Sequence, residues 1–277
     1  MTAVSKPLRK FSGRLVLVGA GKMGSAMLEG WIARGLKPKQ ITVIEPHPGK
    51  TVKALARRGL KLNPKGKAAA ASAIVIAVKP QGAPEALSPL AGYFGSTTLV
   101  VSIMAGRTID FLEKSLPPGA AIVRVMPNTP AAIGRGISVA FGNTGVSTRQ
   151  RKQASDLLAA IGKVEWIGDE ALMDAVTALS GSGPAYLFLL AEAMANAGIA
   201  AGLPPALATR LARETVAGSA ELMHRSALDA ATLRENVTSP GGTTAAALDV
   251  LTGPGGLGHL LAQAIMAATR RSRELAG

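Results

Sequence analysis

A glycine-rich turn near the start of the chain is the first group of residues that predicts chemistry. Gly19, Gly21 and Gly24 form the pattern GxGxxG directly after a short apolar run. In dinucleotide-binding folds the first glycine allows a tight turn, the second lets the backbone approach a pyrophosphate, and the third lets a helix pack closely on a strand. The helix that follows would offer free N–H groups to that pyrophosphate. The turn therefore predicts a dinucleotide site that includes Lys22 and Met23.

An acidic residue, Glu45, stands 21 positions beyond Gly24, at the end of the next apolar run. A carboxylate at this point accepts hydrogen bonds from the ribose 2′-hydroxyl of NAD and repels the 2′-phosphate of NADP. His47, Lys50 and Lys53 follow closely and could partly offset that repulsion. Alternatively, Glu45 is simply a solvated strand end. The residues alone therefore favour NADH over NADPH only slightly.

Three later apolar runs are also followed by loops, and ligands bind at such strand ends in open parallel sheets. Val78 ends the run AIVIAV and precedes Lys79 and Pro80, whereas Ala105 follows TLVVSI and Asn128 follows AIVRV. Lys79 could meet a phosphate or the cofactor amide, or be a surface lysine. Asn128 could bind the nicotinamide or the substrate, although turn formation alone would also explain it. All five residues are predicted to bind the cofactor.

The elements that must position these residues alternate between strand and helix. Their apolar runs are continuous, which is typical of a parallel sheet covered on both faces. The pattern predicts a Rossmann-type doubly wound α/β domain over residues 1–168. A helix should run from the glycine turn to about Ala33, closed by Gly35, and another should span Val52–Arg58. The expected strands are Arg14–Val18, Ile41–Ile44, Ala73–Val78, Thr98–Ile103, Ala121–Val125 and Ile137–Phe141.

The second half, residues 169–277, has Ala- and Leu-rich helical patterns and no convincing strand. Its most apolar stretch, Ala185–Leu203, is interrupted by Glu192 and Asn196. This predicts a buried or interface helix rather than a membrane span. The expected helices are Glu170–Leu179, Pro184–Ala201, Pro205–His224, Ala230–Asn236, Thr243–Leu251 and Leu257–Leu275.

The composition excludes several classes of protein. The net charge of +14 suits nucleic acid, but the basic residues are scattered and only 3% of residues are aromatic, so we expect no nucleic-acid partner. The absence of cysteine excludes disulfides and thiolate metal sites, and no metal is expected. The first dozen residues lack the apolar segment of a secretory signal. We therefore expect a cytoplasmic protein without a membrane partner.

Two glycine-rich segments of the second half also suggest a binding site. LSGSGPAY begins at Leu179 and NVTSPGGTT begins at Asn236, and each leads into an expected helix. The free N–H groups of a helix N-terminus can hold an anion such as a carboxylate. The serine and threonine hydroxyls supply further donors without charge, which fits a small acidic substrate.

Because of these segments and the glycine turn, the chain resembles the Δ1-pyrroline-5-carboxylate reductase family, whose members catalyse the last step of proline biosynthesis. The resemblance rests on GAGKMG, AVKPQ, RVMPNTP, LSGSGPAY and NVTSPGGTT, in order from Gly19 to Thr244. It implies hydride transfer from NADPH or NADH to a cyclic imine, giving L-proline. It also implies that the all-helical C-terminal domain is a dimerisation module. Active sites would form where two subunits meet, in a homodimer or a ring of dimers.

The resemblance further implies roles for the second loop. Thr244 would hydrogen-bond the ring nitrogen of the substrate, and Ser239, Gly242 and Thr243 would hold its carboxylate. Thr244 is otherwise an ordinary capping or first-turn threonine. Many members have a small polar residue and an arginine where this chain has Glu45-Pro46-His47-Pro48, which puts NADPH in doubt but not the family.

Two other functions are weighed against this one. A β-hydroxyacid dehydrogenase also joins a Rossmann domain to a helical domain, but that family uses a catalytic lysine in its second half. Here no lysine follows Lys163, and His224 and His259 have no motif around them that would make either a base. A dinucleotide-binding regulator without chemistry would keep GAGKMG but would have no need of two hydroxyl-rich loops.

Overall fold

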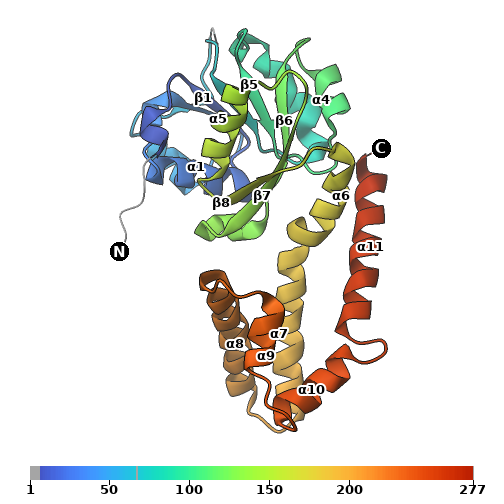
Figure 1. Ribbon diagram of the computed structural model, residues 1–277. Coiled ribbons are helices and arrows are strands. Elements are labelled where there is room, and N and C mark those ends of the chain that lie inside the picture. Colours follow the sequence, from blue (N-terminus) through green and yellow to red (C-terminus); the bar gives the residue numbers. More distant parts are fainter. Residues whose placement is uncertain (1–6, 67, 277) are drawn as a thin grey trace. The chain divides into compact units, whose positions relative to one another are not determined.

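The computed structural model describes residues 7–66 and 68–276 of the chain. The chain divides into two compact units (Figure 1). The first, here called the sheet unit, runs to Gly181 and also contains the residues from Thr269 onward, whereas the helical unit is Ser182–Ala268. The chain therefore passes between the units twice, once at residue 181 and once within its last helix.

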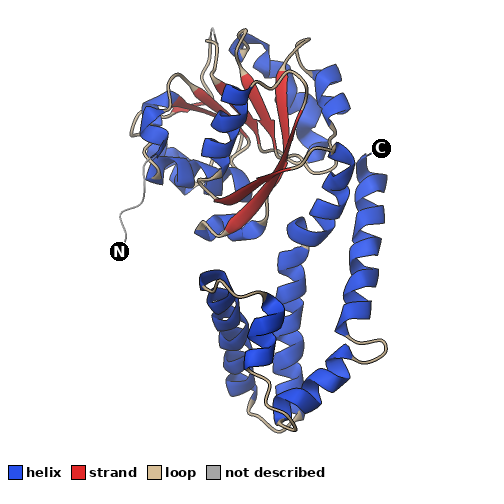
Figure 2. Ribbon diagram, in the orientation of Figure 1, coloured by secondary structure: helices blue, strands red, loops and turns tan. Residues whose placement is uncertain are grey.

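The sheet unit contains an eight-stranded sheet in the order β3-β2-β1-β4-β5-β6-β7-β8 (Figure 2). Strands β1 to β6 are parallel wherever they pair, β7 is antiparallel to β6, and β8 is parallel to β7. The doubly wound, mostly parallel sheet expected from the apolar runs is thus confirmed. The strands are β1 (Leu15–Val18), β2 (Ile41–Ile44), β3 (Lys61–Leu62), β4 (Ala73–Ile76), β5 (Leu99–Ser102), β6 (Ala121–Met126), β7 (Gly136–Gly142) and β8 (Gly162–Trp166).

Helices cover both faces of this sheet because successive strand residues point to opposite sides. Leu15 and Leu17 of β1 pack into one cluster with α1, α2 and α5, whereas Val16 and Val18 pack into another with α3 and α4. The buried Trp31 fixes α1 against α5, since its indole N–H donates to the carbonyl of Leu157 at 2.9 Å. The helices are α1 (Lys22–Ala33), α2 (Lys50–Ala56), α3 (Ala83–Leu87), α4 (Ile109–Ser115), α5 (Thr148–Leu158) and α6 (Met173–Val176).

The structure differs from the sequence expectation at the far edge of the sheet. The run Ile137–Phe141 is part of β7, which is antiparallel rather than parallel, because the short link after β6, including the 3₁₀ helix Thr129–Ile133, leaves no room for a crossover helix. Strand β8 was not expected. Its exposed Lys163 and Glu165 alternate with half-buried residues, so it carries no continuous apolar run.

The start of the second half is also more irregular than expected. Instead of one helix over Glu170–Leu179, the chain forms a 3₁₀ turn, α6, and then a π-helical turn over Thr177–Gly181. At the other end of the chain, the hydroxyl of Ser272 in α11 (Leu257–Ala276) donates to the Asp174 carboxylate at 2.6 Å. The last turns of α11 are thereby tied to α6 within the sheet unit.

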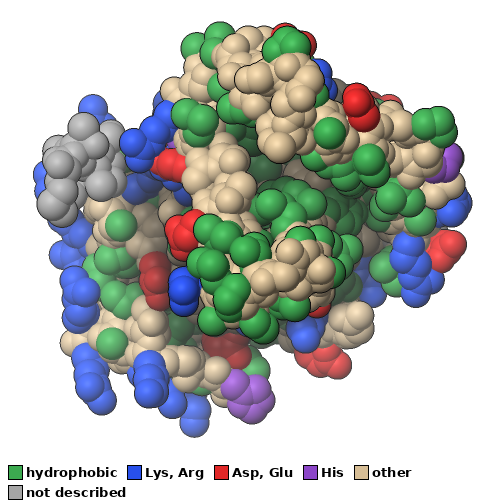
Figure 3. All heavy atoms as spheres, turned by 90° about the horizontal axis from the view of Figure 1, so that it is seen from below, with side chains coloured by type: hydrophobic (Ala, Val, Ile, Leu, Met, Phe, Trp, Pro, Cys, Tyr) green, Lys and Arg blue, Asp and Glu red, His purple; other side chains and the backbone are tan. Residues whose placement is uncertain are grey.

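The helical unit holds α7 (Gly183–Ala200), α8 (Pro205–Arg225), α9 (Ala230–Asn236), α10 (Thr243–Thr252) and the first part of α11. These helices match the expected ranges closely. Within the described residues, no helix is both long and apolar enough to span a membrane. Helix α7 is nevertheless largely uncovered in the single chain, with Phe188 70% and Leu189 63% exposed. Hydrophobic side chains gather over this unit in the face shown in Figure 3.

Candidate functional site

The glycine turn begins at the carboxyl end of β1, and its shape requires glycine at two positions. Gly19 has φ +87°, and a Cβ atom there would lie 2.7 Å from the carbonyl oxygen of Ala77. A Cβ atom on Gly24 would collide with the carbonyl oxygen of Gly19. Side chains are therefore excluded where the strand turns into α1 and where α1 packs against that turn.

The N-terminus of α1 is open to an anion. Its N-cap residue is Gly21, no side chain caps the helix, and the first intrahelical bond runs from the Ser25 N–H to the Gly21 carbonyl. The N–H groups of Lys22, Met23 and Gly24 are thus available to a ligand. A Cβ atom on Gly21 would meet no described protein atom within 4 Å. The arrangement fits a pyrophosphate, with Met23 contributing backbone only because its side chain packs on the core.

Glu45, directly after β2, points back onto the glycine turn. Its carboxylate accepts the Ala20 N–H at 2.7 Å and the His47 N–H at 2.8 Å. The backbone of Glu45 is fixed by Asn63, whose side-chain oxygen accepts the Glu45 N–H and whose amide group donates to the Glu45 carbonyl, both at 2.8 Å. Sequence reasoning missed Asn63. Its left-handed backbone (φ +44°) is a conformation that asparagine tolerates better than most residues, but its partner could not be read from the sequence.

The remaining predicted cofactor residues follow β4, β5 and β6, so they lie at the same edge of the sheet as the glycine turn. Val78 and Pro80 are half-buried, whereas Lys79 and Ala105 are exposed. The side-chain oxygen of Asn128 accepts the Ile137 N–H at 2.9 Å. The oxygen therefore supports the start of β7, while the amide N–H₂ group of Asn128 can donate to a ligand.

The predicted substrate residues lie in the helical unit, in the loop between α9 and α10 and in the first turn of α10. Ser239, Pro240, Gly241 and Gly242 form a turn in which the Gly242 N–H donates to the Ser239 carbonyl at 3.0 Å. Gly241 has φ +68°, as the third position of a type II turn requires. The turn delivers the chain into α10 with Gly242 as N-cap and no side-chain cap.

Thr243 and Thr244 are consequently the first two residues of α10, with backbone N–H groups at its positive end. Thr244 is not the capping residue, because Gly242 occupies that position. The Thr244 side chain is half-buried and that of Ser239 exposed. The loop thus combines hydroxyl groups and free N–H groups on one short segment, which can hold a carboxylate without a cationic side chain.

Helix α9, just before this loop, is capped by Asp229. The hydrogen bond from the Thr232 N–H, 2.8 Å long, lowers the pKa of the Asp229 carboxyl below its usual 3.8. At the other end of α9, the Thr238 hydroxyl donates to the Arg234 carbonyl at 2.7 Å. Both ends of α9 are therefore fixed by side chains, and the loop that follows starts from a defined position.

A buried ion pair in the sheet unit was also missed by sequence reasoning. Arg124 of β6, 4% exposed, lies 2.7 Å from the Glu170 carboxylate. The same carboxylate oxygen accepts the Ile109 N–H at the first turn of α4, at 2.9 Å. The pair holds the start of the second half against the sheet. Among the described residues, no cluster of acidic or histidine side chains could hold a metal ion.

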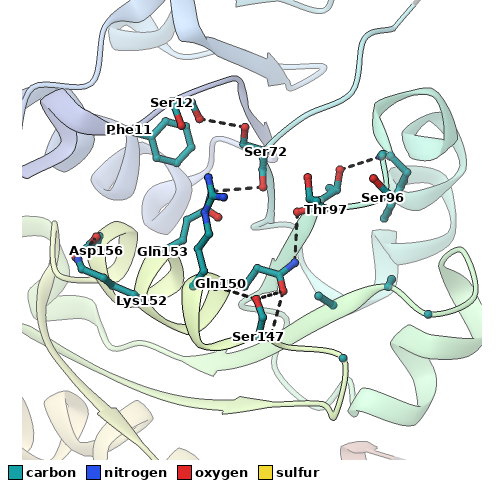
Figure 4. Close-up of a pocket in the computed structure, with 18 of the residues that line it drawn as sticks. Phe11, Ser12, Ser72, Ser96, Thr97, Ser147, Gln150, Lys152, Gln153 and Asp156 are labelled. Atoms are coloured by element: carbon teal, nitrogen blue, oxygen red, sulfur yellow. Dashed lines mark hydrogen bonds and ion pairs between the residues drawn. The ribbon is translucent and has the colours of Figure 1, made fainter.

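A cavity of about 670 Å³ opens at the opposite, amino edge of the sheet (Figure 4). Several of its polar side chains bond to the protein itself. Gln153 of α5 donates to the Ser72 carbonyl at 3.4 Å, Gln150 donates to the Thr97 carbonyl at 3.3 Å, and Lys152 pairs with Asp156 at 2.6 Å. None of the predicted cofactor or substrate residues lines this cavity, so we assign it no role in the chemistry.

Two family models match the chain. Residues 170–275 match the model described as pyrroline-5-carboxylate reductase dimerisation. Residues 14–106 match the model described as NADP oxidoreductase, coenzyme F420-dependent. The oxidoreductase model lies within the sheet unit. The dimerisation model covers the helical unit together with the residues on either side of it.

Relatives named pyrroline-5-carboxylate reductase match almost the whole chain. The protein from Pseudomonas aeruginosa is 40% identical over 265 residues, covering 95% of this chain and 97% of its own. The Arabidopsis thaliana protein is 35% identical, and its match covers 97% of this chain and 98% of its own. A solved pyrroline-5-carboxylate reductase from Coxiella burnetii superposes with a TM-score of 0.88 at 34% identity, over 96% of this chain and 99% of that one. The Plasmodium falciparum pyrroline carboxylate reductase, solved with NADP bound, gives 0.79 at 30% identity over the same shares.

Proposed function

Because the chain belongs to the pyrroline-5-carboxylate reductase family, we propose that it reduces 1-pyrroline-5-carboxylate to L-proline with NADPH or NADH, the last step of proline biosynthesis. The observation that carries this proposal is the match to relatives of that name over nearly the whole chain. The open N-terminus of α1 and the hydroxyl-bearing loop before α10 are what such a reaction needs.

The bound nicotinamide would supply the hydride for C5 of the pyrroline ring. The ring nitrogen must carry or receive one proton, so that hydride and proton together saturate the C=N bond. An iminium is already electrophilic, and the protein therefore needs to position the ring more than it needs a strong base. This agrees with a substrate loop that offers hydroxyl and N–H groups and no ionisable side chain between residues 236 and 244.

The division of roles follows the two units. Gly19, Gly21, Lys22, Met23 and Gly24 would bind the pyrophosphate at the turn and at α1, and Glu45 the adenine-side ribose. The nicotinamide half would lie along the ends of β4, β5 and β6. There the binding residues would be Val78, Lys79, Pro80, Ala105 and Asn128. The boundary at residue 168 between cofactor and substrate domains stays a prediction.

Ser239, Gly242 and Thr243 would hold the substrate carboxylate, and Thr244 would hydrogen-bond the ring nitrogen. The turn at Pro240 and Gly241 supports this assignment, because it directs the chain so that N–H groups and hydroxyls come from consecutive residues. The positive end of α10 adds an attraction for the carboxylate.

The choice between the two cofactors would depend on Glu45. Its carboxylate is held at the glycine turn by two backbone N–H groups, so it cannot swing away without losing both bonds. We therefore keep the slight preference for NADH, although the Plasmodium falciparum relative was solved with NADP. A fixed carboxylate accepts a ribose hydroxyl and repels a 2′-phosphate.

Assembly into a homodimer or a ring of dimers would cover the apolar helices of the helical unit. Leu187, Phe188 and Leu189 of α7 are each at least half exposed, and monomeric proteins rarely leave a continuous apolar patch of this kind uncovered. Sedimentation velocity on the purified protein tests this, and a monomer at micromolar concentration would contradict it. The cytoplasmic location expected from the sequence stays a prediction.

One assay separates the proposed activity from its alternatives. The purified protein is mixed with 1-pyrroline-5-carboxylate and either NADH or NADPH, and cofactor oxidation is followed together with proline formation. We expect one proline for each cofactor oxidised. Tight dinucleotide binding without turnover would favour a regulator. Reduction of NAD+ or NADP+ by a hydroxy acid, supplied in a parallel reaction in place of the pyrroline and the reduced cofactor, would favour a dehydrogenase.

A further inference from the structure

Arg107 lies between two of the loops that the cofactor is expected to contact. It follows Gly106 (φ +70°) in the loop after β5, two residues beyond Ala105. Its Nη2 donates to the carbonyl of Pro80, in the loop after β4, at 3.3 Å. The guanidinium carbon stands 4.4 Å from the ring centroid of Phe111 in α4. One side chain therefore joins two loops and braces both against a helix.

At this position Arg107 satisfies its own hydrogen-bonding groups poorly. Its Nε is buried and has no hydrogen-bond partner among the described residues, and the bond to Pro80 is a long one. A buried donor without a partner destabilises the folded state. The ring of Phe111 offsets part of this cost through a cation–π contact. An apolar side chain would fill the same space without the cost, so the contribution of Arg107 should be found in what it connects.

We propose that Arg107 is a positioning residue that fixes the loop Val78–Pro80 against the loop Ala105–Gly106 and so sets the shape of the nicotinamide half of the cofactor groove. The proposal rests on the proposed function for the identity of the groove. The order of the strands separates the two halves, because Glu45 and the glycine turn follow β2 and β1, whereas the loops joined by Arg107 follow β4 and β5. Loss of the link should therefore weaken binding of the nicotinamide end of the dinucleotide and leave binding of the adenine end unchanged.

This separation gives a direct test by binding, without turnover. The variant Arg107→Met keeps an unbranched side chain against Phe111 but removes every donor to Pro80. We expect its dissociation constant for NADH to rise about tenfold, as loss of a hydrogen bond to a fixed loop predicts. The dissociation constant for ADP-ribose, which lacks the nicotinamide, should change less than about twofold. A general loss of structure would weaken both ligands alike.

A matched control is available in the same unit. Arg151 of α5 stands 4.2 Å from the ring of Trp166, the same kind of cation–π contact at the other side of the sheet. Arg151→Met should leave the affinities for NADH and ADP-ribose unchanged. If Arg107→Met does not fold, Phe111→Leu takes its place, since it removes the ring under the guanidinium and leaves the Pro80 bond. That variant should weaken NADH, but not ADP-ribose, by a smaller factor.

Kinetics give a second measurement in the holoenzyme. Arg107→Met should raise the KM for the cofactor while the KM for 1-pyrroline-5-carboxylate stays within about twofold of the wild-type value. The proposal is overturned if the variant binds NADH as the wild type does, or if NADH and ADP-ribose weaken equally. If the protein binds the dinucleotide but turns over no pyrroline, the proposed function fails while the binding comparison still decides the role of Arg107.

Discussion

Replacing Glu45 by serine should shift the cofactor preference toward NADPH. The structure holds the Glu45 carboxylate at the glycine turn through the N–H groups of Ala20 and His47, at 2.7 and 2.8 Å. A ribose whose 2′-hydroxyl hydrogen-bonds this carboxylate would, in NADPH, carry a 2′-phosphate beside it, with the two charges about 4 Å apart. Serine removes the charge and most of the reach of the side chain.

The expected size follows from two effects. Two unit charges 4 Å apart repel by about 4 kcal/mol at an effective dielectric constant of 20. Glu45 is half-exposed, so solvent and salt reduce this to roughly 1 kcal/mol. NADH meanwhile loses a hydrogen bond to a charged group, about 1.5 kcal/mol. The sum of about 2.5 kcal/mol corresponds to a roughly 70-fold change in the ratio of kcat/KM for NADH to that for NADPH.

The assay measures kcat/KM with each cofactor at fixed, saturating 1-pyrroline-5-carboxylate. Glu45→Gln removes the charge but keeps an acceptor, so it should relieve the repulsion while preserving part of the NADH affinity. Glu165→Ser is the matched control, because Glu165 is an exposed carboxylate on the edge strand β8. A ratio that stays within about twofold in Glu45→Ser, or one that moves equally in Glu165→Ser, would refute the reasoning about the ribose.

Three further predictions concern the substrate loop, the glycine turn and the cap of α9. Thr244→Val should lower turnover about 10- to 100-fold through loss of one substrate hydrogen bond. In the control Thr209→Val, the hydroxyl that is lost donates to the Pro205 carbonyl, so turnover should not fall. Equal kinetics in the two variants would remove Thr244 from the mechanism. Gly24→Ala should destabilise the fold by about 1–3 kcal/mol in denaturant unfolding because its Cβ meets the Gly19 carbonyl. Gly21→Ala should keep the stability but weaken NADH binding, and similar unfolding midpoints for the two would contradict the packing argument. The lowered pKa of Asp229 means that its cap stabilises α9 fully above pH 3.8 and is lost as the pH falls through that lowered pKa. The difference in Tm between wild type and Asp229→Ala should therefore be constant from neutral pH to about 5 and shrink below 3.8, and a difference that persists in acid would rule this out.

Local patterns predicted the elements that position the cofactor. The glycine turn, β2 and the helix closed by Gly35 follow from residue types within a few positions of one another, and their bounds agree with the structure closely. The same holds for α7 to α11, whose bounds follow from helical patterns, with a proline in the first turn of α7 and α8. Such features depend on backbone preferences that neighbouring residues determine.

Features that depend on distant partners could not be predicted. The direction of β7 depends on where a short link can return the chain, and β8 alternates because it lies at the sheet edge. Asn63 supports Glu45 from 18 residues away, and Arg124 pairs with Glu170 from 46 residues away. Only the folded chain brings these side chains together, so their roles follow from contacts and not from composition or spacing.

The return of α11 to the sheet unit has a practical consequence for dissecting the protein. A fragment that stops at Gly181 would lack Ser272, the donor that the structure gives to the Asp174 carboxylate. It would also lack the segment of α11 near Gly106, where Leu275 lies within van der Waals reach of an added Cβ atom. Without these contacts, the surface of the nucleotide-binding half next to the loop that carries Ala105 would be exposed. A construction that links residue 181 directly to Thr269 would retain these contacts within a single shorter polypeptide.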